Sequence, residues 1–110
     1  MRLPNPERSI IDEEKLSGYC LNPSHSDGQH KARVFASALG MDIDDSQELR
    51  IALMEAIQTT DAVLDKRNSY GQKYRVDFLM VRGEKQAMVR SVWIVRDDED
   101  FPRLITCFVL

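Results

Sequence analysis

Apolar and polar residues alternate along the last third of the chain. Residues 72–81 place apolar side chains on one face of an extended backbone and charged side chains on the other; the apolar positions are Tyr74, Val76, Phe78 and Met80, and the charged positions are Lys73, Arg75 and Asp77. A period of two is typical of a strand with one buried face. This segment therefore predicts a strand that needs a second layer packed on it.

Two further segments, residues 87–96 and 104–110, predict strands that are apolar on both faces, as central strands are. Residues 82–85 predict the turn before the first of them, because Gly83 can adopt a positive φ. An exposed final strand of this composition would favour aggregation. It must therefore be central, covered by an extended N-terminal segment near residues 8–11, or buried in a dimer interface.

The first 61 residues show the spacing of helices instead. Asp12 is placed to cap a first short helix, which the Asn-Pro pair at residues 22–23 ends. A second helix is predicted over residues 28–39, and Gly40 stands where a helix-ending glycine belongs. Apolar side chains line one face of each helix; they are Leu16, Tyr19 and Cys20 in the first, and Ala32, Phe35, Ala36 and Leu39 in the second.

The third helix has the clearest pattern. Asp45 or Ser46 is placed to cap it, and Glu48 follows Asp45 by three residues, as in a capping box. The apolar stripe of this helix consists of Leu49, Ala52, Leu53, Ala56 and Ile57. Residues 59–61 end the helix, and residues 62–65 predict a short edge strand.

Helices followed by antiparallel strands indicate the α+β class. The sequence predicts three N-terminal helices packed on a C-terminal three- to four-stranded antiparallel meander sheet. A chain of 110 residues is long enough for one hydrophobic core. We therefore expect a single domain over residues 1–110.

The composition is that of an ordinary globular protein, with 43% hydrophobic and 30% charged residues. No apolar segment is long enough to span a bilayer, and the N-terminus lacks the apolar region of a signal peptide. These features predict a cytoplasmic protein without a membrane partner. Cys20 and Cys107 lack the spacing of metal ligands, so we expect two reduced thiols that pack as small apolar groups.

The net charge of -3 hides an uneven distribution. Residues 42–65 contain seven acidic residues and one basic residue, whereas residues 66–96 contain eight basic residues and two acidic ones. Two interpretations are open. The basic sheet and the acidic helices form surface ion pairs with each other, or the sheet presents a positive surface that can meet phosphates.

One set of candidate residues lies near the second helix. His25, His30 and Lys31 are close in sequence; histidine suits proton transfer near neutral pH, and a lysine can stabilise a charged phosphate. A structural interpretation is also open and is favoured without further context, in which His25 caps the loop and Lys31 extends along the protein surface. Two histidines alone do not make a metal site.

A second set lies on the predicted sheet. Arg90 interrupts an apolar strand, so it must be paired, with Asp77 as the natural partner, or presented to an anionic ligand. Ser91 and Thr106 add hydroxyl groups nearby. Tyr70 and Tyr74 flank the start of the sheet, where they could stack on a base or serve as rim and core residues.

The sequence contains none of the common phosphate-binding, zinc-protease, thiol-redox or esterase motifs. Several segments nevertheless resemble a bacterial family classed as a domain of unknown function, whose members occur alone and as C-terminal domains of phage-head-morphogenesis-type polymorphic toxins. The resemblance covers nearly the whole chain. It is carried by Leu3-Pro4-Asn5, Lys15-Leu16 with Tyr19-Cys20-Leu21-Asn22-Pro23 and His25, Gly28 with Lys31-Ala32-Arg33-Val34-Phe35, Tyr70-Gly71 with Tyr74, Arg90-Ser91 with Trp93-Ile94-Val95, and Pro102-Arg103-Leu104 with Thr106.

The toxin context and the order of helices and strands are similar to the barnase, EndoU, colicin and RelE group of metal-independent ribonucleases. That resemblance implies an RNA-cleaving site without a cofactor or metal, with His25 as general acid or base, Lys31 and Arg90 on the phosphate, and Thr106 as an orienting hydroxyl. Tyr70, Tyr74, Ser91 and Arg103 would bind the substrate.

The implied partners are RNA and a cognate antitoxin or immunity protein. The alternative function is a non-catalytic protein-interaction module, or a homodimer, formed through the apolar strands.

Overall fold

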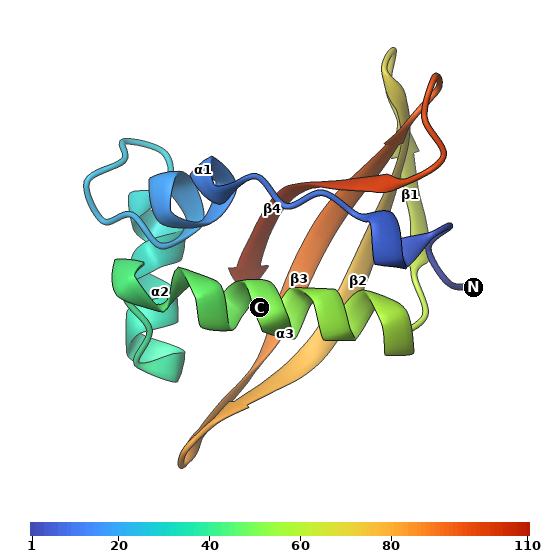
Figure 1. The fold of residues 1–110 in the computed structure, drawn as a ribbon. Coiled ribbons are helices and arrows are strands. Elements are labelled where there is room, and N and C mark those ends of the chain that lie inside the picture. Colours follow the sequence, from blue (N-terminus) through green and yellow to red (C-terminus); the bar gives the residue numbers. More distant parts are fainter.

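The computed structural model describes residues 1–110 and has the predicted α+β organisation (Figure 1). The helices precede the strands along the chain, and the predicted fourth strand is present. The helical elements are η1 (Pro6–Arg8), α1 (Glu13–Lys15), η2 (Leu16–Cys20), α2 (Gln29–Leu39), η3 (Ile43–Asp45) and α3 (Ser46–Thr59). The strands are β1 (Val63–Arg67), β2 (Gly71–Arg82), β3 (Lys85–Arg96) and β4 (Pro102–Val109).

The four strands form an antiparallel meander in the order β1-β2-β3-β4. β2 and β3 pair along their full lengths, from Gly71 opposite Arg96 to Arg82 opposite Lys85. Gly83, with φ 61°, and Glu84 form the two-residue turn between them. The predicted turn is therefore two residues shorter than the segment 82–85.

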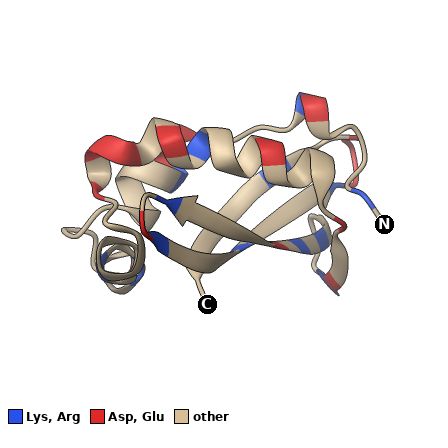
Figure 2. Cartoon of the chain, turned by 90° about the horizontal axis from the view of Figure 1, so that it is seen from below, with Lys and Arg blue, Asp and Glu red and all other residues tan.

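The helices α1 to α3 lie on one side of the sheet and along its β4 edge (Figures 1 and 2). The predicted alternation in β2 is confirmed, because Val76 and Met80 are buried and Tyr74 and Phe78 pack against the same core. Trp93 of β3 is the largest fully buried side chain. The alternate residues of β2, which include Lys73, Arg75 and Asp77, lie on the sheet face directed away from α3. We call this face of the sheet the outer face.

β4 is an edge strand, but part of its edge is covered by the N-terminal segment. The Ile10 N–H donates to the Pro102 carbonyl at 2.9 Å, and the Leu104 N–H donates to the Ile10 carbonyl at 3.0 Å. Farther along the strand, the Cys107 N–H donates to Cys20 Sγ in η2. Of the three alternatives for the final strand, the structure therefore contains the N-terminal cover, supplemented by η2.

The first predicted helix is not regular. Asp12 does cap it, accepting a hydrogen bond from the Glu14 N–H at 3.1 Å, but only α1 is α-helical. The next turn, η2, is a π-helix in which the Leu21 N–H donates to the Leu16 carbonyl at 2.9 Å. This wider turn buries both Leu16 and Cys20 against the sheet.

The other two helices follow the prediction more closely. Gly40 ends α2 with φ 63°, as expected for a left-handed helix-ending residue. At the start of α3, however, the predicted Asp45 and Glu48 capping box is wrong. Asp42 and Asp45 form the box instead, around the short turn η3 that precedes α3. None of the helices combines the length and the apolar character needed to cross a bilayer.

Candidate functional site

Tyr19 of η2 is the centre of the candidate site. Lys31 Nζ donates a hydrogen bond to the Tyr19 hydroxyl at 2.8 Å and lies 4.7 Å from the centre of its ring. The His25 ring packs edge-on against the same tyrosine, with 4.9 Å between ring centres. The structure therefore brings two of the predicted catalytic residues to one aromatic side chain that the sequence assigned only to an apolar stripe.

His25 is fixed by its own loop. Its Nδ1 atom accepts hydrogen bonds from the backbone N–H groups of Asp27 and Gly28, each at 3.0 Å. A neutral imidazole that accepts at Nδ1 carries its proton on Nε2, so Nε2 is the atom left to act as a donor. The predicted capping role of His25 is confirmed, and it leaves one nitrogen of the ring for chemistry.

Gly28 allows this close packing. A Cβ atom at this position would lie 2.2 Å from the Tyr19 carbonyl oxygen, which is far inside van der Waals contact. The His25 loop can therefore approach η2 only because residue 28 has no side chain.

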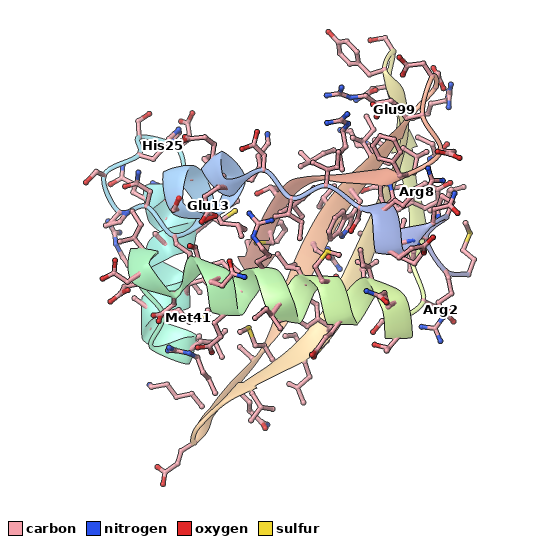
Figure 3. All side chains as sticks on the ribbon, in the orientation of Figure 1. Arg2, Arg8, Glu13, His25, Met41 and Glu99 are labelled. Atoms are coloured by element: carbon pink, nitrogen blue, oxygen red, sulfur yellow. The ribbon has the colours of Figure 1, made fainter.

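His25 and Thr106 line the same open hollow beside the edge of β4. Thr106 reaches it because β4 contains a bulge, between the residues that pair with Val92 and Trp93. Figure 3 shows His25 on the loop above η2, at the same end of the molecule as Glu13. The complete lining is Asp12, Glu14, Lys15, Gly18, Tyr19, His25, Ile105 and Thr106.

Two buried cysteines lie beneath Thr106. Cys20 Sγ is 3.6 Å from Thr106 Oγ1 and accepts the Cys107 N–H at 3.4 Å. Hydrogen bonding from Cys107, aided by Thr106 and the charge of Lys31, lowers the pKa of Cys20 to about 7 in spite of burial. Both thiols are free, as predicted, and Cys20 with Thr106 ties η2 to β4.

Arg90 lies outside this hollow, on the outer face. Its guanidinium binds both carboxylate oxygens of Asp77, at 2.9 and 2.8 Å, which confirms the predicted pairing. Hydrogen bonding from Arg90 lowers the pKa of Asp77 below its ordinary value. Arg90 is opposite Phe108 on β4, and the Phe108 ring lies 5.9 Å from Lys31 Nζ. Phe108 therefore connects the outer face to the group formed by Tyr19, His25 and Lys31.

The residues expected to bind substrate do not gather at the hollow. Ser91 is fully buried, where it donates to the Val76 carbonyl and accepts the Trp93 Nε1–H, each at 2.8 Å. Tyr74 packs against the core. Tyr70 is exposed at the β1–β2 turn, and Arg103 is held by Glu99, which Figure 3 labels at the opposite end of the molecule from His25.

Charge is divided between the two layers. The strands contain nine basic residues and two acidic ones, whereas most acidic positions lie on the helices and their connections (Figure 2). Five of the basic residues, Lys66, Lys73, Arg75, Lys85 and Arg96, form no ion pair within the chain. The strand residues are Lys66, Arg67, Lys73, Arg75, Arg82, Lys85, Arg90, Arg96 and Arg103 against Asp65 and Asp77.

Both sequence interpretations of the charges are partly realised. Arg82 pairs with Asp45 and Glu48 of the helical layer, so some strand cations do neutralise helix acids. Lys73 and Arg75 remain available on the outer face. This division produces a positive sheet surface on a chain whose net charge is negative.

Sequence reasoning missed three residues of the hollow. The sequence pattern places Tyr19 in a helix stripe and Lys15 in the family resemblance, and it does not single out Glu14. The position of Tyr19 shortly before the Asn-Pro stop and the histidine loop was the available signal for that residue. No three His, Cys, Asp or Glu side chains come together in an arrangement that could hold a metal ion.

Comparison with known proteins yields one match. A family model described as "Domain of unknown function (DUF6883)" matches residues 2–110. No curated protein and no solved structure matches the chain. The matched segment spans nearly all of the sequence. The chain therefore belongs to the DUF6883 family of domains of unknown function.

Proposed function

We propose that this domain cleaves RNA by general acid–base catalysis without a metal ion, with the hollow beside Tyr19 as its active site. One observation carries the proposal: His25 from a loop and Thr106 from β4 line one hollow, and Lys31 from α2 binds the tyrosine beside it. These are side chains that can move a proton, orient a phosphate and stabilise its charge. The resemblance to toxin domains and small ribonucleases supports the same reaction.

The proposed reaction transfers a phosphodiester to its neighbouring 2′-hydroxyl. Glu14 takes the hydroxyl proton, the 2′-oxygen bonds to phosphorus and the bond to the 5′-oxygen breaks. The neutral His25 Nε2–H donates a hydrogen bond to that leaving oxygen, which takes its proton from water, and the resulting hydroxide takes the proton from Glu14. Lys31 stabilises the additional negative charge in the transition state, and Thr106 orients the phosphate. The products are a 2′,3′-cyclic phosphate and a free 5′-hydroxyl.

The positive outer face is the proposed binding surface for the RNA strand. Arg75 and Lys73 are unpaired there, and the row from Arg75 across Val92 leads to Thr106 at the hollow. The neighbouring row contains Arg90 and Phe108. Cations on such a surface bind phosphates and release counterions, and an aromatic ring can stack on a base. The resemblance to toxins extends the proposal to a cognate antitoxin or immunity protein as a second partner.

A non-catalytic interaction module is the second candidate. It is favoured by the complete structural roles of two proposed site residues, since His25 caps its loop and Arg90 is fully engaged by Asp77. A module of this kind would bind its partner without altering it. Activity of the unmodified protein therefore separates the two candidates.

The test is incubation of the purified chain with RNA in the presence of a metal chelator. We expect cleavage with 2′,3′-cyclic phosphate ends, detected by gel electrophoresis and mass spectrometry, and no cleavage of DNA of the same sequence. Intact RNA after prolonged incubation at high enzyme concentration would eliminate the nuclease proposal. The protein must be folded in the same buffer, as judged by circular dichroism.

The outer face makes a separate prediction about binding. Arg75→Glu should weaken binding of a 2′-O-methyl RNA 12-mer, which cannot be cleaved, by about tenfold. It should also reduce the slope of log binding constant against log salt concentration by about one, the value for one lost phosphate contact. Fluorescence anisotropy at several salt concentrations measures both. Arg33→Glu makes the same charge change at an exposed position of α2 and is the matched control. Equal losses for the two variants would assign the binding to overall charge rather than to the outer face.

A further inference from the structure

One edge of β2 has no partner over most of its length. β1 pairs with β2 only between Gln72 and Arg75, and no other strand lies on that side of the sheet. The β2 segment 76–82 is therefore a free edge of seven residues. Such an edge presents a row of unpaired backbone donors and acceptors, which is the usual template for addition of another strand.

The register identifies the backbone groups that point outward. Arg82 and Lys85 flank the two-residue turn, so they form a pair that exchanges hydrogen bonds, and alternate pairs along the hairpin do the same. The intervening residues Asp77, Leu79 and Val81 direct their N–H and C=O groups away from β3. Three donors and three acceptors are thus available on the free edge.

A groove beside this edge can receive side chains. It lies between α3 and β2, and its apolar lining includes Ile51, Phe78 and Met80. Leu79 and Val81, which also line the groove, are 53% and 60% exposed, so the strand presents apolar side chains to solvent here. The polar part of the lining includes Glu48, Glu55 and Asp77 and contains no Lys or Arg.

We propose that the free edge of β2 binds an extended segment of a partner protein that adds to the sheet as a further strand. Glu48 is paired with Arg82 and Asp77 with Arg90, so Glu55 is the unpaired acid of the groove. Its charge selects the occupant, since a segment alternating apolar residues with Lys or Arg would fill the apolar lining and complement Glu55. A second copy of this chain would instead bring its own Glu55 against this one. Like charges across an interface oppose such a dimer.

The probe is a capped seven-residue peptide that alternates valine and lysine, with a peptide alternating valine and glutamate as its control. Hydrogen exchange of the unbound protein should be rapid at the Asp77, Leu79 and Val81 amides. Saturation with the lysine peptide should slow exchange at these three amides at least tenfold, and the glutamate peptide should not. Protection at other sites alone, or equal effects of the two peptides, would overturn the proposal.

Two variants separate the groove from the edge. Glu55→Lys should weaken binding of the lysine peptide about fivefold and strengthen binding of the glutamate peptide, because Glu55 makes no ion pair within the chain. Leu79→Pro should abolish binding of both peptides, since proline removes an outward N–H but none that bonds to β3.

Sedimentation of the free protein tests the competing occupant. A monomer at about 100 μM is expected on the like-charge argument. A dimer with the Asp77, Leu79 and Val81 amides already protected would overturn the proposal in favour of a second copy. None of these readouts depends on RNA cleavage, so the proposed activity and the proposed edge can fail independently.

Discussion

His25→Asn is expected to lower the rate of RNA cleavage by at least about 100-fold, the usual loss when a positioned hydrogen-bond donor to the transition state is removed. Asparagine is chosen because its Oδ1 atom can take the place of Nδ1 and accept the N–H groups of Asp27 and Gly28. The loop cap is retained, while the ring nitrogen that donates a hydrogen bond to the leaving oxygen is removed. Loss of activity can then be assigned to chemistry rather than to a disordered loop.

Two measurements complete this experiment. The thermal midpoint of His25→Asn should stay within a few degrees of the wild type, and binding of the 2′-O-methyl RNA should be unchanged. His30→Asn is the matched control, because His30 is exposed on α2 and does not line the hollow. Undiminished cleavage by His25→Asn would remove His25 from the mechanism, even if the RNA assay of the wild type succeeds.

The sheet could be predicted from sequence because its physical signal is local. Alternation along β2 and the glycine at the turn after it determine a strand, its buried face and its reversal of direction. The edge strand predicted over residues 62–65 is likewise present, although it extends two residues farther, through Lys66 and Arg67. The strand continues through these charged residues because both are exposed.

The cover of β4 could not be predicted uniquely, because it depends on contacts between distant segments. Ile10 is 93 positions from its bridge partner Arg103, and no local pattern specifies that contact. The π-helical turn has the same origin. Leu16, Tyr19 and Cys20 also fit an ordinary α-helical stripe, and packing of Cys20 against β4 accompanies the wider turn.

The candidate site was predicted in part for a related reason. Residue type pointed to His25 and Lys31, and the alternative roles named for His25 and Arg90 are the ones the structure contains. Ser91 could not be distinguished from a surface hydroxyl, because its burial follows from pairing with Val76 and from the indole of Trp93. Polar residues on a core face are recognisable only once their partners are known.

Trp93→Ala is expected to have the largest effect on stability, a loss of about 3–5 kcal/mol in the free energy of unfolding. Trp93 is fully buried and lies opposite Leu104 of β4 and Tyr74 of β2, so its removal leaves a cavity at the centre of the sheet. It also deprives the Ser91 hydroxyl of a hydrogen-bond donor. Since small domains have only about 5–15 kcal/mol in total, this loss approaches complete unfolding.

Urea denaturation followed by circular dichroism measures the effect, and two variants test its cause. Trp93→Phe keeps most of the apolar volume but removes the indole N–H, so a smaller loss of about 1–2 kcal/mol is expected. Leu79→Ala deletes an exposed side chain of the same sheet and should change stability by less than about 0.5 kcal/mol. If Leu79→Ala cost as much as Trp93→Ala, the outer face would be covered in solution. The core on the helical side would then not be the main source of stability.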